Sequence, residues 1–226
     1  MDKIDILKSV PIFSDLSDSD LGSIVDKMIP HTFKNGQIIL MEDRIGEHCF
    51  FLTLGRVKIT RLSSDGREVI LALLGIGDFF GEMSLLDGEA RSANVVALEK
   101  TKVLTLNIAD FLDPLEIYPK VAINLLRELA IRLRKSDEQI ASLSLSDAER
   151  RIALSLLRVA EEQGTIRHGH VTINPLPYQQ DIANMAGTSR ETVSRTYGLL
   201  EDDGYIQRDG RKLVIPDYDR FLVDFT

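Results

Sequence analysis

The spacing of the hydrophobic residues changes near residue 116, and this change separates two kinds of structure along the chain. Between residues 30 and 110 the apolar residues form short β-branched or aromatic segments, at 37–41, 48–52, 56–60 and 68–74, with Gly, Asp and Asn between them. Short strands at regular intervals favour a β-barrel or sandwich over βαβ units. The pair Asp65-Gly66 predicts a hairpin, and a short helix is expected ahead of this region, over 21–28.

A heptad stripe follows over residues 116–145. Steps of three and four residues separate its members, which are Leu126, Leu129, Leu133, Ser136, Ile140 and Leu143. This pattern predicts a long helix that pairs with a second copy of itself, so that the chain forms a homodimer. The alternative is that the stripe packs on its own β region. The polar member, Ser136, either fixes the register, faces a ligand or is simply tolerated.

The last third of the chain has the pattern of a winged helix-turn-helix. Ser146 with Glu149 predicts the start of a helix that continues to Gly164. Two further helices are expected over 177–186 and 189–202, with a tight turn at Gly187 between them. The segment 205–215 with Asp209-Gly210 predicts a hairpin with a type I′ turn.

The second helix of this pair carries side chains suited to reading DNA. Thr188 and Ser189 stand at its start, where hydroxyls and backbone amides hold a phosphate. The first two turns then present Arg190, Glu191, Ser194 and Arg195. Arginine pairs with guanine and glutamate accepts from cytosine in the major groove. The alternative is a winged helix that binds protein, with these charges only solvated.

The charge balance limits the kind of DNA binding. The chain has 27 basic and 35 acidic residues, net −8, which excludes a protein that coats nucleic acid non-specifically. Residues 1–113 hold 12 basic and 18 acidic residues, net −6, whereas 147–226 hold 10 and 13, net −3. The hairpin residues Arg208, Arg211 and Lys212 form a local basic group there. A site-specific DNA-binding protein is therefore compatible with this composition.

The segment 77–93 carries the residues of a small anion site. Arg91 offers a planar fork of donors for a phosphate, and Ser92 adds a hydroxyl. Glu82 can accept from a sugar hydroxyl, and Gly81 lets a ligand approach the backbone. A surface turn with an Arg–Glu pair explains the same residues, and the sequence pattern alone leaves both interpretations open.

Several other classes lack support in the sequence. The single cysteine, Cys49, forms no intrachain disulfide and no four-cysteine metal or iron–sulfur site, and fits a reducing cytoplasm. No secretory signal is visible, and no apolar run approaches the ~18 residues of a membrane span. The pair His48-Cys49 suits a strand core better than a haem site. His168 and His170 are too few for a tetrahedral metal site, so no metal is expected.

No catalytic motif is present either, and we expect no enzyme. An enzyme acting on a cyclic nucleotide would need a base beside Arg91, where Glu82 is the sole candidate.

The segment 77–93 resembles the phosphate-binding cassette of cyclic-nucleotide-binding domains. Together with 189–195 and the Ser136 helix, residues 10–215 resemble the CRP/FNR family of bacterial transcription regulators. The resemblance implies an α+β fold with three parts. These are a double-stranded β-helix, or jelly roll, over 1–113, a dimerisation helix over 114–145, and a winged helix-turn-helix over 146–226.

The same resemblance implies ligand contacts residue by residue. Gly81, Glu82 and the adjoining Met83 would line the ribose side of the pocket, and Arg91 and Ser92 would hold a cyclic phosphate. On this basis, replacing Arg91 by Gln is expected to abolish the nucleotide response and leave the fold intact.

Of the positions that would contact the base, Ser136 fits the family pattern, whereas Asp137 and Ala72 depart from it. Ser136 matches a hydroxyl residue that contacts adenine, and Asp137 falls where the partner subunit contributes a second contact. Ser, Thr or Asn is usual at that second position, so Asp137 either accepts from the adenine amino group or disfavours the nucleotide. Ala72 stands where some cAMP receptors have Ser.

The resemblance implies a cytoplasmic homodimeric transcription regulator that is switched by cAMP and contacts RNA polymerase. Its DNA site is expected to be a palindrome with TGTGA-like or TTGA-like arms, read by Arg190, Glu191, Ser194 and Arg195. A regulator that answers another effector, such as cyclic di-GMP, or none, is the alternative.

Overall fold

The computed structural model describes residues 3–226, which form two compact units. One unit comprises the residues up to Arg61 together with Ala72–Ser136, and the other comprises Leu62–Leu71 together with Asp137–Thr226. Within residues 3–226, no helix combines the length and the apolar character that crossing a membrane requires.

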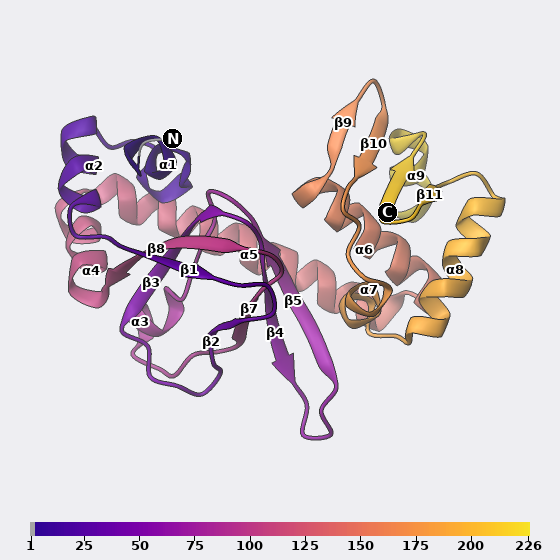
Figure 1. Cartoon of the computed structure of the whole chain (residues 1–226), viewed down its shortest axis with the longest axis horizontal. Coiled ribbons are helices and arrows are strands. Elements are labelled where there is room, and N and C mark those ends of the chain that lie inside the picture. The colour runs from indigo at the N-terminus through magenta and orange to yellow at the C-terminus, as the bar shows by residue number, and fades with distance from the viewer. Residues whose placement is uncertain (1–2) are drawn as a thin grey trace. The chain divides into compact units, whose positions relative to one another are not determined.

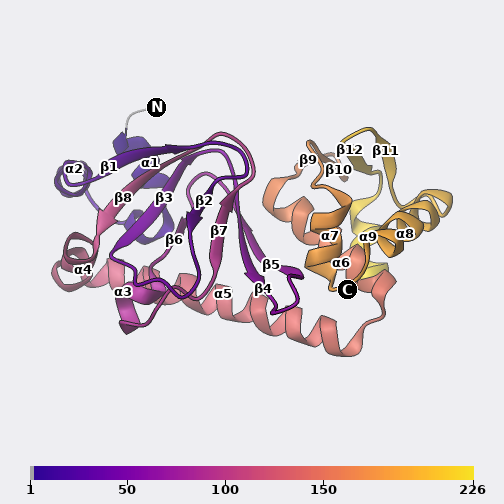
Figure 2. The ribbon, with the colours of Figure 1, turned by 60° about the horizontal axis from the view of Figure 1, so that its bottom comes forward.

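Two antiparallel sheets build the N-terminal domain (Figure 2). One has the order β1 (Ile29–Phe33), β8 (Thr101–Asn107), β3 (His48–Leu54) and β6 (Phe79–Phe80). The other has the order β2 (Ile38–Leu40), β7 (Asn94–Ala97), β4 (Val57–Leu62) and β5 (Glu68–Leu74). Strands distant in sequence pair in both sheets, as a jelly roll requires. The predicted strands and the jelly-roll fold are confirmed.

The hairpin predicted at Asp65-Gly66 joins β4 to β5. Ser63 accepts from the Gly66 N–H at 2.9 Å, and its own N–H donates to the Arg67 carbonyl at 2.9 Å. Gly66 has φ +83°, the left-handed conformation that closes a three-residue loop of the bulge type. Because only Gly adopts this φ without strain, the local sequence was sufficient to predict the hairpin.

Helices cover one end of the first sheet (Figure 1). They are α1 (Lys3–Ser9), α2 (Asp18–Val25), α4 (Ile108–Ile117) and the first turns of α5 (Pro119–Leu145), with a 3₁₀ turn at Pro11–Phe13. Their apolar residues and those of the sheet share one core that includes Phe13, Phe51 and Phe111. The helix expected over 21–28 is α2, which begins earlier because Ser17 caps it by accepting from the Asp20 N–H at 3.3 Å.

The long helix α5 presents two apolar faces. Val121 and Leu125 are buried in the core of the N-terminal domain, and Leu129 packs half-buried against it. The other apolar members of the heptad stripe stay exposed: Leu126 by 66%, Leu133 by 64%, Ile140 by 63% and Leu143 by 47%. Of the apolar stripe, only Leu129 therefore packs on the N-terminal domain; Leu143 lies beside Gly187, and Leu126, Leu133 and Ile140 are exposed.

The C-terminal domain has the element order of a winged helix-turn-helix (Figure 1). Its helices are α6 (Ala148–Gln163), α7 (Gln179–Ala186), α8 (Arg190–Asp202) and α9 (Tyr218–Phe225). Its sheet has the order β11 (Gln207–Asp209), β12 (Lys212–Ile215), β10 (His170–Ile173) and β9 (Thr165–Arg167). The helix-turn-helix prediction is confirmed. The start of α6 was predicted one residue early, because Asp147 and not Ser146 caps it, accepting from the Arg150 N–H at 2.8 Å.

The turn between β11 and β12 differs from the prediction. Asp209 pairs with Lys212, so the two central residues of the turn are Gly210 and Arg211. Gly210 has φ +57°, whereas among the described non-glycine residues only Asp43 and His168 have a positive φ. A type I′ turn needs a positive φ at both central residues, so that prediction is wrong. Glycine at the first central position is the pattern of a type II′ turn.

The turn of the helix-turn-helix depends on Gly187. Gly187 has φ +60° and follows directly on α7. The Thr188 N–H donates to the Ala183 carbonyl at 3.0 Å, and Ala183 is fully buried at the crossing of the helices. A Cβ at Gly187 would lie 3.0 Å from Cδ2 of Leu143. The backbone conformation requires glycine here, because the Leu143 methyl is the end of a half-exposed side chain that can move aside.

We therefore expect Gly187→Ala to lower the free energy of unfolding by about 1–2 kcal/mol, the cost of placing an L-residue in the left-handed region. Urea denaturation followed by circular dichroism measures this loss. Gly75→Ala is the control, since Gly75 has an ordinary φ and open space around it. Equal stabilities of the two variants would contradict the assignment.

Candidate functional site

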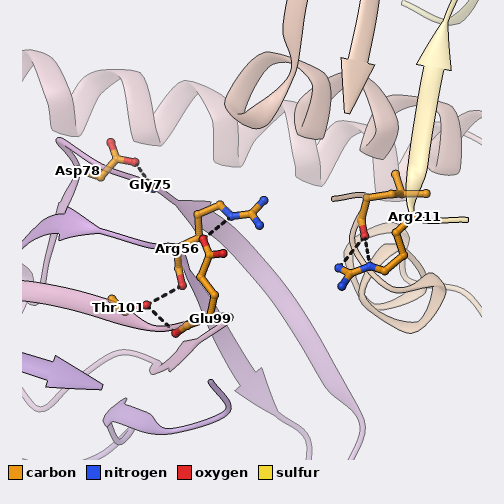
Figure 3. A network of polar contacts seen from close by, with 7 residues as sticks. Arg56, Gly75, Asp78, Glu99, Thr101 and Arg211 are labelled. Carbon is orange, nitrogen blue, oxygen red and sulfur yellow. Dashed lines mark hydrogen bonds and ion pairs between the residues drawn. The ribbon is translucent and has the colours of Figure 1, made fainter. Parts of the chain in front are cut away.

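The cassette 77–93 begins at a turn that is anchored on β3. The Gly75 N–H donates to Oδ2 of Asp78 at 2.8 Å (Figure 3). The Asp78 carbonyl accepts from the Leu52 N–H at 2.9 Å, and the Gly77 N–H donates to the Leu52 carbonyl at 3.0 Å. On a neighbouring connection, Arg56 binds Glu99, and Thr101 donates to the carbonyls of both residues (Figure 3). These contacts hold the start of the cassette in a fixed place.

Arg91 is the centre of the cassette. Its side chain is almost completely buried, with 6% of the residue exposed. Nη1 donates to the Gly81 carbonyl and to Oγ of Ser84 at 2.7 Å, and Nη2 donates to the His48 carbonyl at 2.6 Å. Burial lowers the pKa of the guanidinium, which nevertheless stays charged at neutral pH. One cation thus fastens β3, the turn at Gly81 and the short helix α3 (Met83–Asp87) together.

Two glycines make room for this cation. A Cβ at Gly46 would lie 2.2 Å from Cζ of Arg91, and a Cβ at Gly81 would lie 2.8 Å from Nη1. Gly81 also has φ +83°. The sequence pattern indicated Gly81 but not Gly46 or Ser84, because nothing in the sequence shows that residue 46 faces residue 91.

Arg91 has more N–H donors than its hydrogen bonds within residues 3–226 use. A guanidinium has five N–H donors, and three hydrogen bonds of Arg91 are to protein oxygens of the described chain. Ser92 is exposed, and its hydroxyl makes only a 3.8 Å contact with Sδ of Met83, itself half-exposed. The residues predicted to bind a phosphate, Arg91 and Ser92, therefore lie together, and the exposed Ser92 hydroxyl can donate to a ligand.

Glu82 joins the cassette to α5. Only 3% of Glu82 is exposed, and its Oε1 accepts from Nη1 of Arg132 at 2.9 Å. Nη2 of Arg132 donates to the Phe79 carbonyl at 2.8 Å, and Cζ lies 4.5 Å from the centre of the Phe79 ring. The sequence analysis missed Arg132. Its place four residues before Ser136, on the same face of the helix, was the available signal.

The residues expected to read a base lie on α5. Ser136 is exposed and donates to the Arg132 carbonyl at 3.0 Å. Asp137 is exposed and begins the longer segment of the second compact unit. Ala72 lies in β5. The structure thus connects Ser136 to Arg132 through the helix backbone, and Arg132 connects to Glu82.

The pair His48-Cys49 belongs to the strand core. The His48 carbonyl is an acceptor for Arg91, and Cys49 is fully buried with Sγ 3.5 Å from the Phe80 carbonyl. Burial raises the pKa of the Cys49 thiol well above its ordinary value. Among residues 3–226, no three His, Cys, Asp or Glu side chains form a group that would hold a metal ion.

The recognition helix α8 has one buried and one exposed face. Val193, Tyr197 and Leu200 are buried, whereas Glu191, Ser194 and Arg195 are exposed. Ser189 caps the helix, since its Oγ accepts from the Thr192 N–H at 3.2 Å; Thr188 precedes it, and Arg190 is exposed. The backbone N–H of Glu191 and the Ser189 hydroxyl lower the pKa of the Glu191 carboxyl. All predicted DNA-reading side chains are therefore presented on one end of α8.

A hollow of about 520 Å³ adjoins this end of α8. Its lining includes Arg190, Arg208 and Arg211, with Tyr178 before α7. Cζ of Arg211 lies 4.3 Å from the centre of the Tyr178 ring, and its Nη2 donates to the Leu176 carbonyl at 2.9 Å (Figure 3). The guanidinium of Arg211 is thus held at the hollow, where it adds positive charge beside the recognition helix.

The fold and these sites define a class: a DNA-binding regulator with a β-sandwich effector domain. Residues 30–118 match the cyclic nucleotide-binding domain, and residues 150–222 match the Crp-like helix-turn-helix domain. The chain is 35% identical over 201 residues to the cyclic AMP receptor protein of Thermus thermophilus, covering 89% of this chain and 90% of that protein. It is 29% identical to a CRP-like cAMP-activated global transcriptional regulator of Mycobacterium tuberculosis, covering 96% of each chain.

The structure of FixK2 from Bradyrhizobium japonicum superposes with a TM-score of 0.77 at 26% identity, covering 87% of this chain and 96% of that one. The chain belongs to the CRP/FNR family of transcription regulators. Its named relatives are regulators and not enzymes, as the sequence predicted.

The position of Arg91 changes one expectation about its replacement. In Arg91→Gln the shorter side chain leaves the partly buried carbonyls of Gly81 and His48 without these donors, so the free energy of unfolding should fall by about 1–3 kcal/mol. Urea denaturation measures the loss. The exposed Arg67, which pairs with Asp65, supplies the control Arg67→Gln, for which we expect a change within about 0.5 kcal/mol. An Arg91→Gln protein as stable as the parent would refute the structural role of this cation.

Proposed function

We propose that this protein is a homodimeric transcription regulator whose sequence-specific DNA binding is switched by cAMP bound at the cassette. The observation that carries the proposal is the buried Arg91 beside the exposed Ser92 hydroxyl. Arg91 makes its hydrogen bonds to carbonyl and hydroxyl oxygens, and the nearby Glu82 carboxylate is paired with Arg132, so an anion at the remaining donors of Arg91 adds a favourable interaction. Relatives named as cAMP-activated regulators agree with this choice of anion.

The cassette offers a contact for each part of the phosphate and ribose. The free donors of Arg91 and the Ser92 hydroxyl bind the cyclic phosphate. Oε2 of Glu82 accepts from the ribose hydroxyl while Oε1 remains with Arg132. The turn at Gly81, whose carbonyl binds Arg91, lies beside the sugar, and Met83 covers the edge of the ribose.

The switch acts through α5. A ligand that binds Glu82 alters the pairing of this carboxylate with Arg132, and Arg132 is part of the same helix as Ser136. Ser136 contacts the adenine, and Asp137 of the partner subunit accepts from its amino group. A ligand shifts a conformational equilibrium only by binding one arrangement more tightly, so cAMP must favour the arrangement competent for DNA.

We expect Ser92→Ala to weaken cAMP binding about tenfold without lowering the thermal midpoint of the free protein, because the hydroxyl has no buried partner. Isothermal titration calorimetry with cAMP, cGMP and cyclic di-GMP measures the affinities. Ser64→Ala, at an exposed serine of the β4–β5 hairpin, is the control.

Binding of cyclic di-GMP or cGMP in place of cAMP would overturn the choice of effector. Binding of none of the three would overturn the nucleotide switch. The regulator CLP of Xanthomonas campestris, described as responsive to c-di-GMP, has the same fold at 18% identity, which makes cyclic di-GMP the informative competitor.

The proposed DNA site is a palindrome with TGTGA-like or TTGA-like arms. Arg190, Glu191 and Arg195 read base edges together with Ser194, and the start of α8 at Thr188 and Ser189 holds a phosphate. Two copies of α8 related by the two-fold axis of a dimer meet major grooves ~34 Å apart. The exposed stripe of α5 supplies that dimer contact. We also place the bound dimer in the cytoplasm, in contact with RNA polymerase.

Replacing two arginines of the DNA-binding domain should change DNA binding in different ways. Arg195→Ala should lose about 1–3 kcal/mol of discrimination per half-site, because a base contact is removed. Arg211→Ala should weaken binding to all sequences and reduce the salt slope by about 1, because a phosphate contact is removed.

Fluorescence anisotropy with a palindromic and a scrambled duplex, over a series of salt concentrations, separates the two effects. Arg167→Ala, in the exposed strand β9, is the control. Loss of discrimination in Arg211→Ala but not in Arg195→Ala would reverse the assignment, and footprints without palindromic preference would refute the site.

A further inference from the structure

Gly198 lies inside α8 although nothing in the described residues 3–226 requires glycine there. Glycine in a helix interior is destabilising relative to alanine, because it loses the most backbone freedom on folding. The φ of Gly198 is not positive, in contrast to Gly187. A Cβ at Gly198 would meet no atom within 4 Å apart from the backbone of its own helix. Neither backbone conformation nor packing among the described residues explains this residue.

The position of Gly198 on the helix suggests an external reason. Gly198 follows Glu191 by seven residues, Ser194 by four and Arg195 by three, so the four residues share one face. The opposite face holds the buried Val193, Tyr197 and Leu200. Gly198 therefore lies at the middle of the face that the base-reading residues occupy, one turn further from the start of the helix.

We propose that Gly198 is a positioning residue that sets how deeply α8 enters the major groove. At this position the DNA strand that forms the wall of the groove comes into van der Waals contact with the helix backbone. Any side chain would hold the helix away and withdraw Arg195 from the bases. This inference rests on the proposed DNA binding and adds a contact to it.

The charges around Gly198 locate this contact along the helix. Asp202 follows Gly198 by four residues on the same face, and its carboxylate repels phosphates. Glu201 is paired with Arg208, which reduces its own repulsion. The strand therefore passes α8 before its last turn, at Gly198, where no side chain stands in its way.

The test is a substitution that moves stability and DNA affinity in opposite directions. Gly198→Ala should raise the thermal midpoint of the free protein by about 2–4 °C, since alanine is the better helix former and has room. The same change should weaken binding to a duplex with inverted TGTGA or TTGA arms at least tenfold, and Gly198→Leu should weaken it further. Anisotropy with the full-length protein and saturating cAMP measures the affinity.

Gly22→Ala is the matched control. Gly22 lies inside α2, has an ordinary φ and has open space where its Cβ would be. It should raise the thermal midpoint and leave DNA affinity unchanged. Gly198→Ala binding DNA as tightly as the parent would overturn the inference, as would a loss of affinity that sedimentation traces to a change in oligomeric state. If the parent protein bound neither the duplex with TGTGA arms nor the duplex with TTGA arms, that result would refute the proposed function and not the role of Gly198.

Discussion

The N-terminal domain depends on one buried cation. Arg91 donates to the carbonyls of His48 and Gly81 and to the hydroxyl of Ser84, so segments distant in sequence converge on a single guanidinium. A charge taken out of water is tolerated only when it is hydrogen-bonded or paired. The absence of side chains at Gly46 and Gly81 follows from the same cation, since a Cβ at either position would overlap it. The cassette is thus shaped around Arg91 before any ligand arrives.

A second charged contact extends this arrangement to the helix. Arg132 binds Glu82 and lies over the Phe79 ring, so an ion pair joins α5 to the cassette. The Glu82 carboxylate of this pair is shielded from water. Glu82 is almost fully buried whereas the Arg132 side chain is 31% exposed, so removing Arg132 would leave an uncompensated buried carboxylate. Any ligand group that binds Glu82 must therefore preserve or replace this pairing. This makes Glu82 the point at which the cassette and α5 respond together.

The parts that the sequence predicted are those that depend on near neighbours in the chain. The turn at Gly187, the hairpin at Gly66 and the exposed face of α8 each follow from residues a few positions apart. The pairing of Arg132 with Glu82 was missed because 50 residues separate the partners. The type I′ prediction failed for a related reason: the register of β12, which pairs with β10 as well as β11, decides which residues occupy the turn. The sequence pattern predicts the conformation of short segments. Contacts between distant segments then decide which of the possible turns and pairings forms.

The two apolar faces of α5 have different surroundings. Val121 and Leu125 bind the helix into the N-terminal domain, while Leu126, Leu133 and Ile140 leave an apolar stripe in water. A heptad stripe is self-complementary across a two-fold axis, so we infer that a second copy covers it. One helix then carries Arg132 on the face toward the cassette and the dimer contact on the other. A change at Glu82 that shifts α5 must alter the dimer contact as well, and both recognition helices move by symmetry. The palindromic site that we propose would then follow from the same two-fold axis as the pairing of the cassettes.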